Sequence, residues 1–145
     1  MTDFKKGVVN INGLDISRNT PSADVLEKLG GICTKHFKTT SSIIENFHFE
    51  NIEVLDRKFN IFVNYVMHEI SFIVLVSQSN DETTEAERHE EDKQWLNKLL
   101  GEPSSHDKFG IVYKYDNVKI SADKINGDND EVVGGCNQII NPRKK

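Results

Sequence analysis

The sequence has little of what marks several common protein classes. Only two of its 145 residues are cysteines, Cys33 and Cys136, and its 18 Lys and Arg are outnumbered by 23 Asp and Glu. Two cysteines without metal-type spacing do not build the disulfide scaffold of a small secreted protein. The net charge is −5, whereas direct nucleic-acid binding needs a basic surface. We therefore expect a protein of the reducing cytoplasm that does not contact nucleic acid directly.

Long apolar runs are missing as well. The richest stretch, residues 59–76, is interrupted by polar residues that include Asn60, Asn64, His68 and Glu69. It is too short and too polar for a membrane span. The first ten residues have no apolar core of the kind that a signal peptide needs. We expect no membrane contact and a cytoplasmic location. The length suits a single domain over residues 1–145.

Two phrases occur twice, in the same order. Residues 47–54 (FHFENIEV) and 113–120 (YKYDNVKI) match type for type, and a helix-like phrase precedes each copy, VLEKLG at 25–30 and WLNKLLG at 95–101. This indicates an internal duplication, with repeat halves at 7–77 and 82–140. In each octet, an acid followed by Asn predicts a two-residue hairpin turn between paired strands.

The N-terminal part of the chain predicts a hairpin, and a loop further on. Asn12 and Gly13 separate two strand-like segments, 7–11 and 14–17. Asn-Gly is a strong signal for a two-residue hairpin turn. Residues 31–42 have few apolar side chains and no clear period, so we expect a loop there.

Two helices are predicted. The first follows Thr20, which is expected to cap it, and ends at Gly30, with its inward residues at Val25, Leu26 and Leu29. The second covers residues 85–100, has core spacing in its second half and is ended by Gly101. Acids fill the first half of this second helix. They suit the positive end of the helix dipole, and they also offer a surface for a basic partner.

Residues 59–67 and 70–76 form the most strand-like pair. With His68 and Glu69 as a two-residue turn, Phe62 lies across from Leu75, and Ile73 lies on the same second face. That apolar face needs a cover, which is either another part of this chain or another protein. A last strand is expected at 132–140. The fold class predicted is α+β, with an antiparallel sheet of about six to eight strands packed with two helices.

No motif predicts catalysis, and we expect neither an enzyme nor a cofactor. Ser104, Ser105, His106 and Asp107 carry the letters of a catalytic triad, but triads are assembled from separated positions. Cys33 and His36 lack the second pair of ligands of a structural zinc site. Residues 128–131 are acidic without the spacing of a calcium loop. Catalytic, cofactor and metal residues are therefore none.

The repeated helix and strands resemble a known architecture. Residues 10–30, with an Asn-Gly turn and the phrase LEKLG, and residues 95–103 (WLNKLLGEP) are similar to the tandem helix-plus-sheet repeats of β-lactamase-inhibitory-protein-like bacterial domains. The resemblance implies an inhibitor, an envelope-assembly factor or a toxin-immunity protein. It carries over no site residue.

From these observations we hypothesise a cytoplasmic immunity protein that binds and neutralises a bacterial toxin domain, such as a basic nuclease, by occluding its active site. A small-ligand-binding or regulatory module and an unrecognised enzyme are the alternatives, and a homodimer stays open. The residues expected to bind the partner are an apolar group and an acidic group: Phe62, Ile73 and Leu75, and Glu87, Glu90, Glu91 and Asp92.

Overall fold

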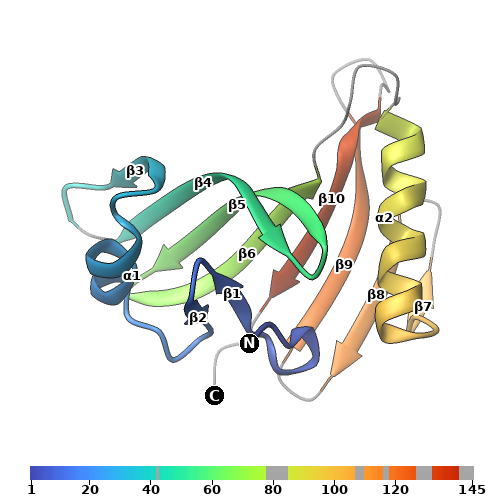
Figure 1. Cartoon of the computed structure of the whole chain (residues 1–145), viewed down its shortest axis with the longest axis horizontal. Helices are drawn as coiled ribbons and strands as arrows, with labels where there is room; N and C mark the ends of the chain where they lie inside the picture. Colours follow the sequence, from blue (N-terminus) through green and yellow to red (C-terminus); the bar gives the residue numbers. More distant parts are fainter. Residues whose placement is uncertain (42, 78–84, 107–109, 116–117, 127–131, 141–145) are drawn as a thin grey trace.

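A computed structural model describes residues 1–41, 43–77, 85–106, 110–115, 118–126 and 132–140 (Figure 1). These residues form an eight-stranded antiparallel sheet in the order β3-β4-β5-β6-β10-β9-β8-β7, together with a separate hairpin of β1 and β2. The strands are β1 (Val9–Ile11), β2 (Leu14–Ile16), β3 (Cys33–Lys38), β4 (Ile44–Val54), β5 (Arg57–Val66), β6 (Glu69–Ser77), β7 (Ser105–His106), β8 (Gly110–Tyr115), β9 (Val118–Asn126) and β10 (Val132–Ile140). The predicted α+β class and strand number are confirmed.

Each of the two helices precedes four strands. Helix α1 (Ser22–Leu29) is followed by β3 to β6, and helix α2 (Glu85–Leu100) is followed by β7 to β10. The two sets of strands meet at the centre of the sheet, where β6 pairs with β10. This element order is compatible with a duplicated unit. The duplication itself, with its halves at 7–77 and 82–140, stays a prediction.

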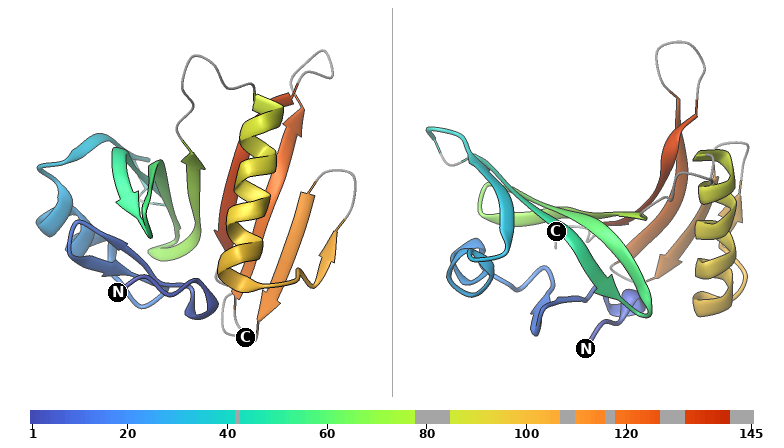
Figure 2. Two further views of the ribbon diagram at one scale, coloured as in Figure 1. Left: turned by 45° about the vertical axis from the view of Figure 1, so that its right-hand side comes forward. Right: turned by 45° about the horizontal axis from the view of Figure 1, so that its top comes forward.

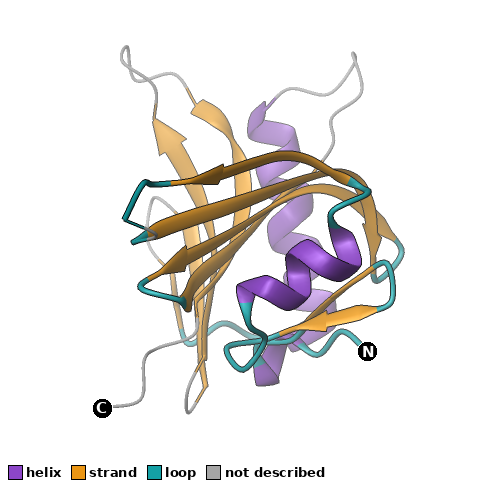
Figure 3. Cartoon of the chain, turned by 90° about the vertical axis from the view of Figure 1, so that its left-hand side faces the viewer, coloured by secondary structure: helices purple, strands orange, loops and turns teal. Residues whose placement is uncertain are grey.

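One face of the sheet is covered, and no described element lies on the other. Both helices, the β1–β2 hairpin and the short 3-10 helix η1 (Phe4–Lys6) lie on the same side (Figures 2 and 3). A single apolar cluster fills the space between these elements and the sheet. Its largest fully buried side chains include Tyr65, Tyr113, Phe47, Phe49 and Phe59.

The N-terminal hairpin is confirmed, whereas the predicted helix cap is wrong. Asn12 and Gly13 both have positive φ, 48° and 97°, between β1 and β2. The hydroxyl of Thr20 donates to the carbonyl of Asp15 and accepts from the amide of Ser17, so it does not cap α1. Within α1, Val25 and Leu29 are buried, but Leu26, also expected to face inward, is 47% exposed.

Helix α2 has the bounds that the sequence predicts. It ends where Gly101 takes a φ of 82°, a conformation that glycine adopts without a steric penalty. Leu96 is fully buried, while Trp95 is only half-buried. The indole ring packs against Phe4 and Phe59, with centroid distances of 5.8 and 5.3 Å.

The two octets fold differently. In the second, Tyr113 pairs with Ile120 and Tyr115 with Val118, so the predicted hairpin register is confirmed. In the first, β4 runs on through the octet and the chain turns at Leu55 and Asp56 instead. Asn51 does take the positive φ expected of it, 58°. It lies at an irregularity in the β4–β5 pairing, where a bulge absorbs the extra residue without ending the strand.

The β5–β6 register differs from the prediction by one residue. The chain turns at Met67 and His68, both with positive φ, and Val66 pairs with Glu69 and Tyr65 with Ile70. An irregularity follows, with Ser71 as the extra residue, so Asn64 pairs with Phe72 and Ile61 with Leu75. Because side chains alternate between faces, a one-residue slip moves a strand's whole apolar set to the other face. Ile73 and Leu75 therefore lie in the core and are fully buried. The partner of Phe62 is Val74.

Strand β3 lies where a loop was predicted. Five of its six residues pair with β4 at the edge of the sheet, and five of the six are exposed. A solvent-exposed edge strand buries few side chains, so its sequence does not need to alternate between apolar and polar residues. Asn126 and Gly127 form a second Asn-Gly pair, which predicts another turn, and Gly127 lies outside the described residues. No helix in the described ranges is long and apolar enough to cross a membrane.

Candidate docking face

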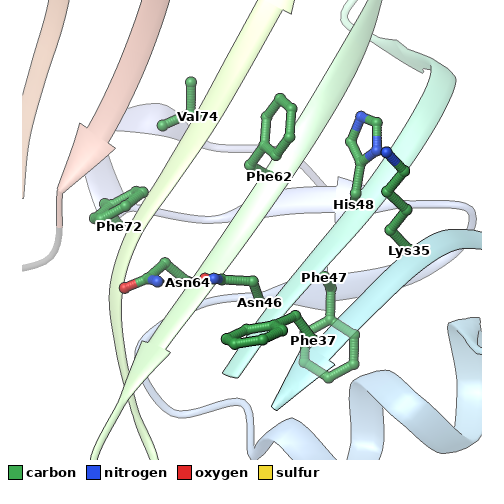
Figure 4. Close-up of a pocket in the computed structure, with 9 residues that line it drawn as sticks. All are labelled: Lys35, Phe37, Asn46, Phe47, His48, Phe62, Asn64, Phe72 and Val74. Carbon is green, nitrogen blue, oxygen red and sulfur yellow. Dashed lines mark hydrogen bonds between the residues drawn. The ribbon is translucent and has the colours of Figure 1, made fainter. Parts of the chain in front are cut away.

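The open face of β3 to β6 carries an aromatic surface, which we call the aromatic face. It consists of Lys35 and Phe37 on β3, Asn46 and His48 on β4, Phe62 and Asn64 on β5, and Phe72 and Val74 on β6. These side chains surround a hollow of about 540 Å³ (Figure 4). No described element covers this face, and Phe37 and Phe62 are 56% and 40% exposed.

Sheet register places these side chains in two rows across the strands. In one row, His48 pairs with Phe62, and Phe62 pairs with Val74. The imidazole of His48 stacks on the ring of Phe62, with centroids 4.3 Å apart and planes 9° apart. The stack holds both rings in place, because cross-strand neighbours on one face are in direct contact.

The second row combines amides with aromatic rings. Phe37 pairs with Asn46, Asn46 with Asn64, and Asn64 with Phe72. The side-chain amide of Asn64 donates a hydrogen bond to the side-chain oxygen of Asn46. Two amides flanked by two phenyl rings give a surface that can bury apolar groups and also hydrogen-bond to a partner.

One edge of the aromatic face is fixed by polar contacts. The hydroxyl of Thr34 lies 3.1 Å from Nδ1 of His48 and donates to the carbonyl of His48 at 3.0 Å. On the opposite face, Nε2 of His36 lies 2.7 Å from Oε2 of Glu45. Burial opposes ionisation of Glu45, but hydrogen bonds from His36 and Ser22 and the charge of Lys38 hold its pKa below the usual value. These contacts attach β3 to β4 on both sides.

A second polar cluster lies under α2 and does not reach the aromatic face. Asp92 is fully buried, accepts from Nη2 of Arg57 at 2.9 Å and from the hydroxyl of Ser77 at 3.1 Å. Burial raises the pKa of the Asp92 carboxyl, although both partners favour its charged form. The guanidinium lies over Phe59 and Trp95, at 5.3 and 5.2 Å from the ring centroids. The cluster anchors the helix to β5 and β6.

The expected partner-binding residues fall into three groups. Phe62 lies on the aromatic face, where it is open to a partner. Ile73, Leu75 and Asp92 are fully buried, so their assignment to a contact surface was wrong: the register slip explains the first two, and the ion pair with Arg57 explains the third. Glu87, Glu90 and Glu91 are exposed on α2, and Glu90 pairs with Lys93 at 2.7 Å.

The apolar and acidic groups do not form one surface. Helix α2 packs on the covered side of the sheet (Figures 2 and 3). The aromatic face is on the other side, because its residues alternate with buried ones along β4, β5 and β6. Sequence reasoning missed Phe37, His48, Phe72 and Val74. The alternation of Phe72 and Val74 with Ile73 and Leu75 was visible, but the irregularity at Ser71, which turns the first pair outward, was not.

The aromatic face has binding chemistry and no arrangement typical of a catalytic centre. Its described ionisable groups are Lys35 and His48, and among the described residues no group of three or more His, Cys, Asp or Glu side chains could hold a metal ion. Comparison of the chain with family models, with curated proteins and with solved structures found no match. The geometry itself is therefore the basis for a functional proposal.

Proposed function

We propose that this chain is a binding protein that docks another protein on the aromatic face. The observation that carries the proposal is the exposure of Phe37 and Phe62 on a face with no described cover. Soluble proteins rarely leave such apolar patches open unless they bind something there. Aromatic residues flanked by polar groups also match the composition of the centre of a protein interface.

The partner class that we propose is a bacterial toxin domain, with a basic nuclease as the form to test first. The resemblance to inhibitory domains and the net charge of −5 support this choice. A rigid sheet face suits inhibition, because it loses little conformational freedom when it covers an active site. The acidic residues Glu87, Glu90 and Glu91 would then act at a distance, by steering a basic partner.

A small planar ligand is the second candidate. The hollow of about 540 Å³ falls in the range of small-molecule sites, and the stacked rings of His48 and Phe62 suit an aromatic group. The two candidates differ in how much of the face they use. A ligand would fill the hollow alone, whereas a protein would also cover the exposed ring of Phe37 at its rim.

The test uses two variants with matched exposure. Phe62 on the aromatic face and Leu99 on α2 are both 40% exposed, so Phe62→Asp and Leu99→Asp place the same charge at equally accessible sites. Wild type and both variants serve as baits in extracts of the source cell. The proposal expects one protein that wild type and Leu99→Asp retain and Phe62→Asp loses.

The captured protein is then purified and its own activity is measured with increasing amounts of this chain. Stoichiometric inhibition by wild type, with none by Phe62→Asp, supports an inhibitor. A protein retained equally by both variants would contradict docking on the aromatic face. Binding of a small molecule by the purified chain, with no protein dependent on Phe62, would favour the second candidate.

A further inference from the structure

Strand β3 is an open edge of the sheet. It lies at the end of the strand order, and β4 is its only neighbouring strand among the described residues (Figure 1). Five of its six residues are exposed, and Cys33 is half-buried. The opposite edge, β7, has only two residues. Within the described residues, β3 is therefore the edge long enough to pair with another strand.

The backbone groups that face outward on β3 can be identified. Thr39 donates its amide to the carbonyl of Ile44 at 3.0 Å, in the register that pairs Phe37 with Asn46 and Lys35 with His48. Antiparallel pairs alternate between hydrogen-bonded and non-hydrogen-bonded. The N–H and C=O groups of His36 and Lys38 therefore point away from β4, toward the open edge.

The side chains of β3 determine which charge an added strand should carry. Lys35 and Phe37 lie on the aromatic face, and His36 and Lys38 lie on the other face. Lysines on an edge strand prevent pairing with apolar or basic strands. A second copy of β3 would bring two further lysines to this edge and no acid to offset them, because the segment Cys33–Lys38 contains none. An acidic strand meets no such repulsion.

We propose that β3 binds an acidic extended segment of the partner protein, which adds to the sheet as a ninth, antiparallel strand. This rests on the proposed function and names the mode of contact. Main-chain hydrogen bonds to His36 and Lys38 give affinity, and alternate side chains give specificity, as in other strand-addition complexes. The register requires acids opposite Lys38 and Lys35, three residues apart, with an apolar residue opposite Phe37.

The probe follows from this pattern. A capped peptide Thr-Glu-Val-Thr-Glu-Thr presents the required order, and Thr-Lys-Val-Thr-Lys-Thr is its charge-reversed control. Full-length protein is titrated with each peptide while amide hydrogen exchange is followed by NMR. We expect the acidic peptide alone to slow exchange at the amides of His36 and Lys38, with an effect that weakens as salt screens the charges.

Two variants separate charge from strand pairing. Lys35→Glu with Lys38→Glu should exchange the preference, so that the basic peptide protects β3 and the acidic one does not. Lys38→Pro removes an outward N–H that β4 does not use, which edge strands tolerate. It should weaken binding about tenfold, by the loss of one ladder bond and its charge contact. Thermal melts verify that each variant is folded.

Several results would overturn the inference: no protection of β3 by either peptide, equal protection by both, or protection of β3 in the free protein with sedimentation as a dimer. A dimer with β3 already protected would mean that β3 pairs with a second copy of this chain. None of these results affects the loss of a captured protein with Phe62→Asp, which tests the aromatic face. Conversely, peptide binding at β3 together with unchanged capture by Phe62→Asp would support strand addition at β3 and contradict docking on the aromatic face.

Discussion

At the scale of residues, alternation decides which apolar side chains hold the fold and which meet solvent. Along β6, Ile73 and Leu75 are fully buried in the core, while Phe72 and Val74 between them line the open hollow. The four side chains have similar hydrophobicity, so burial depends on the β5–β6 register, which the irregularity at Ser71 shifts by one residue. The register therefore gives one set of side chains in this strand to the core and the other set to the open face.

This separation makes the two kinds of position respond differently to truncation. Leu75→Ala should lower the free energy of unfolding by about 3 kcal/mol, as core leucine truncations do. Phe62→Ala should lower it by about 1 kcal/mol, chiefly through loss of the stack on His48. Urea unfolding of both variants gives the comparison. A larger loss at Phe62 than at Leu75 would mean that the β5–β6 register is incorrect.

Glu45 should contribute pH-dependent stability. Its pKa is lowered from an ordinary value of 4.5 by His36, Ser22 and Lys38, against the effect of burial. The folded state thus favours the carboxylate, so the contribution is present above pH 4.5 and is lost as pH falls through the lower folded value. Burial raises the pKa of Tyr65, and the charge of Glu45 adds to this effect.

Glu45→Gln should therefore lower the free energy of unfolding at pH 7 by about 1.5 kcal/mol, the value of a charged hydrogen bond. The difference from wild type should shrink as pH falls below 4.5. Glu53→Gln, at an exposed position of the same strand, is the control and should follow wild type throughout. Denaturant unfolding at a series of pH values measures both. A difference that does not depend on pH would contradict the role given to the carboxylate.

At the scale of elements, one ion pair attaches α2 to the sheet. Arg57 begins β5, and Asp92 lies in the middle of the helix with no exposed surface. Two aromatic rings, Phe59 and Trp95, pack against the guanidinium. Loss of one member of a buried pair leaves a charge without compensation, which is more costly than replacing both.

Arg57→Leu should thus lower the free energy of unfolding by about 3–5 kcal/mol, the range for breaking a buried pair. Adding Asp92→Leu should restore much of that loss, because no isolated charge then remains. Thermal and denaturant unfolding of the two single variants and the double variant give the coupling free energy. If the two effects simply add, Arg57 and Asp92 do not act as a pair.

The elements also show what the sequence could and could not predict. Helix α2, strand β10 and the β1–β2 turn were found because glycine, Asn-Gly and long periodic segments give local signals. Strand β3 was missed because an exposed edge needs no alternating pattern. The Glu50-Asn51 turn was wrong because Asn51 supports a positive φ at a bulge as well as in a turn. Phe62 was placed on the open face, while Ile73 and Leu75 were misplaced because the irregularity at Ser71 shifts the β5–β6 register and gives no local signal in the sequence.

At the scale of the whole molecule, charge and apolar surface are on different sides. The acids Glu87, Glu90 and Glu91 lie on α2, across the sheet from the aromatic face. They can attract a basic partner over a distance but are not positioned to contact a domain docked on that face. Steering of this kind changes association more than dissociation.

Reversal of these three acids to lysine should slow association with a basic partner by about tenfold at low salt and flatten its salt dependence. Dissociation should change little. Asp92 is kept in this variant because its reversal would bury a charge against Arg57. Surface plasmon resonance at several salt concentrations separates the two rates. Association rates that do not vary with salt in wild type would remove steering from the account.

The measurement that tests the central claim most directly is the affinity of the captured partner for Phe62→Asp and for Leu99→Asp, each compared with wild type by calorimetry. A central aromatic contact accounts for 2 kcal/mol or more in typical interfaces. Phe62→Asp should therefore raise the dissociation constant by at least about thirtyfold. Leu99→Asp should leave it within about twofold of wild type, and both variants should melt near the wild-type temperature. Equal affinity for all three proteins, or a loss confined to Leu99→Asp, would contradict docking on the aromatic face.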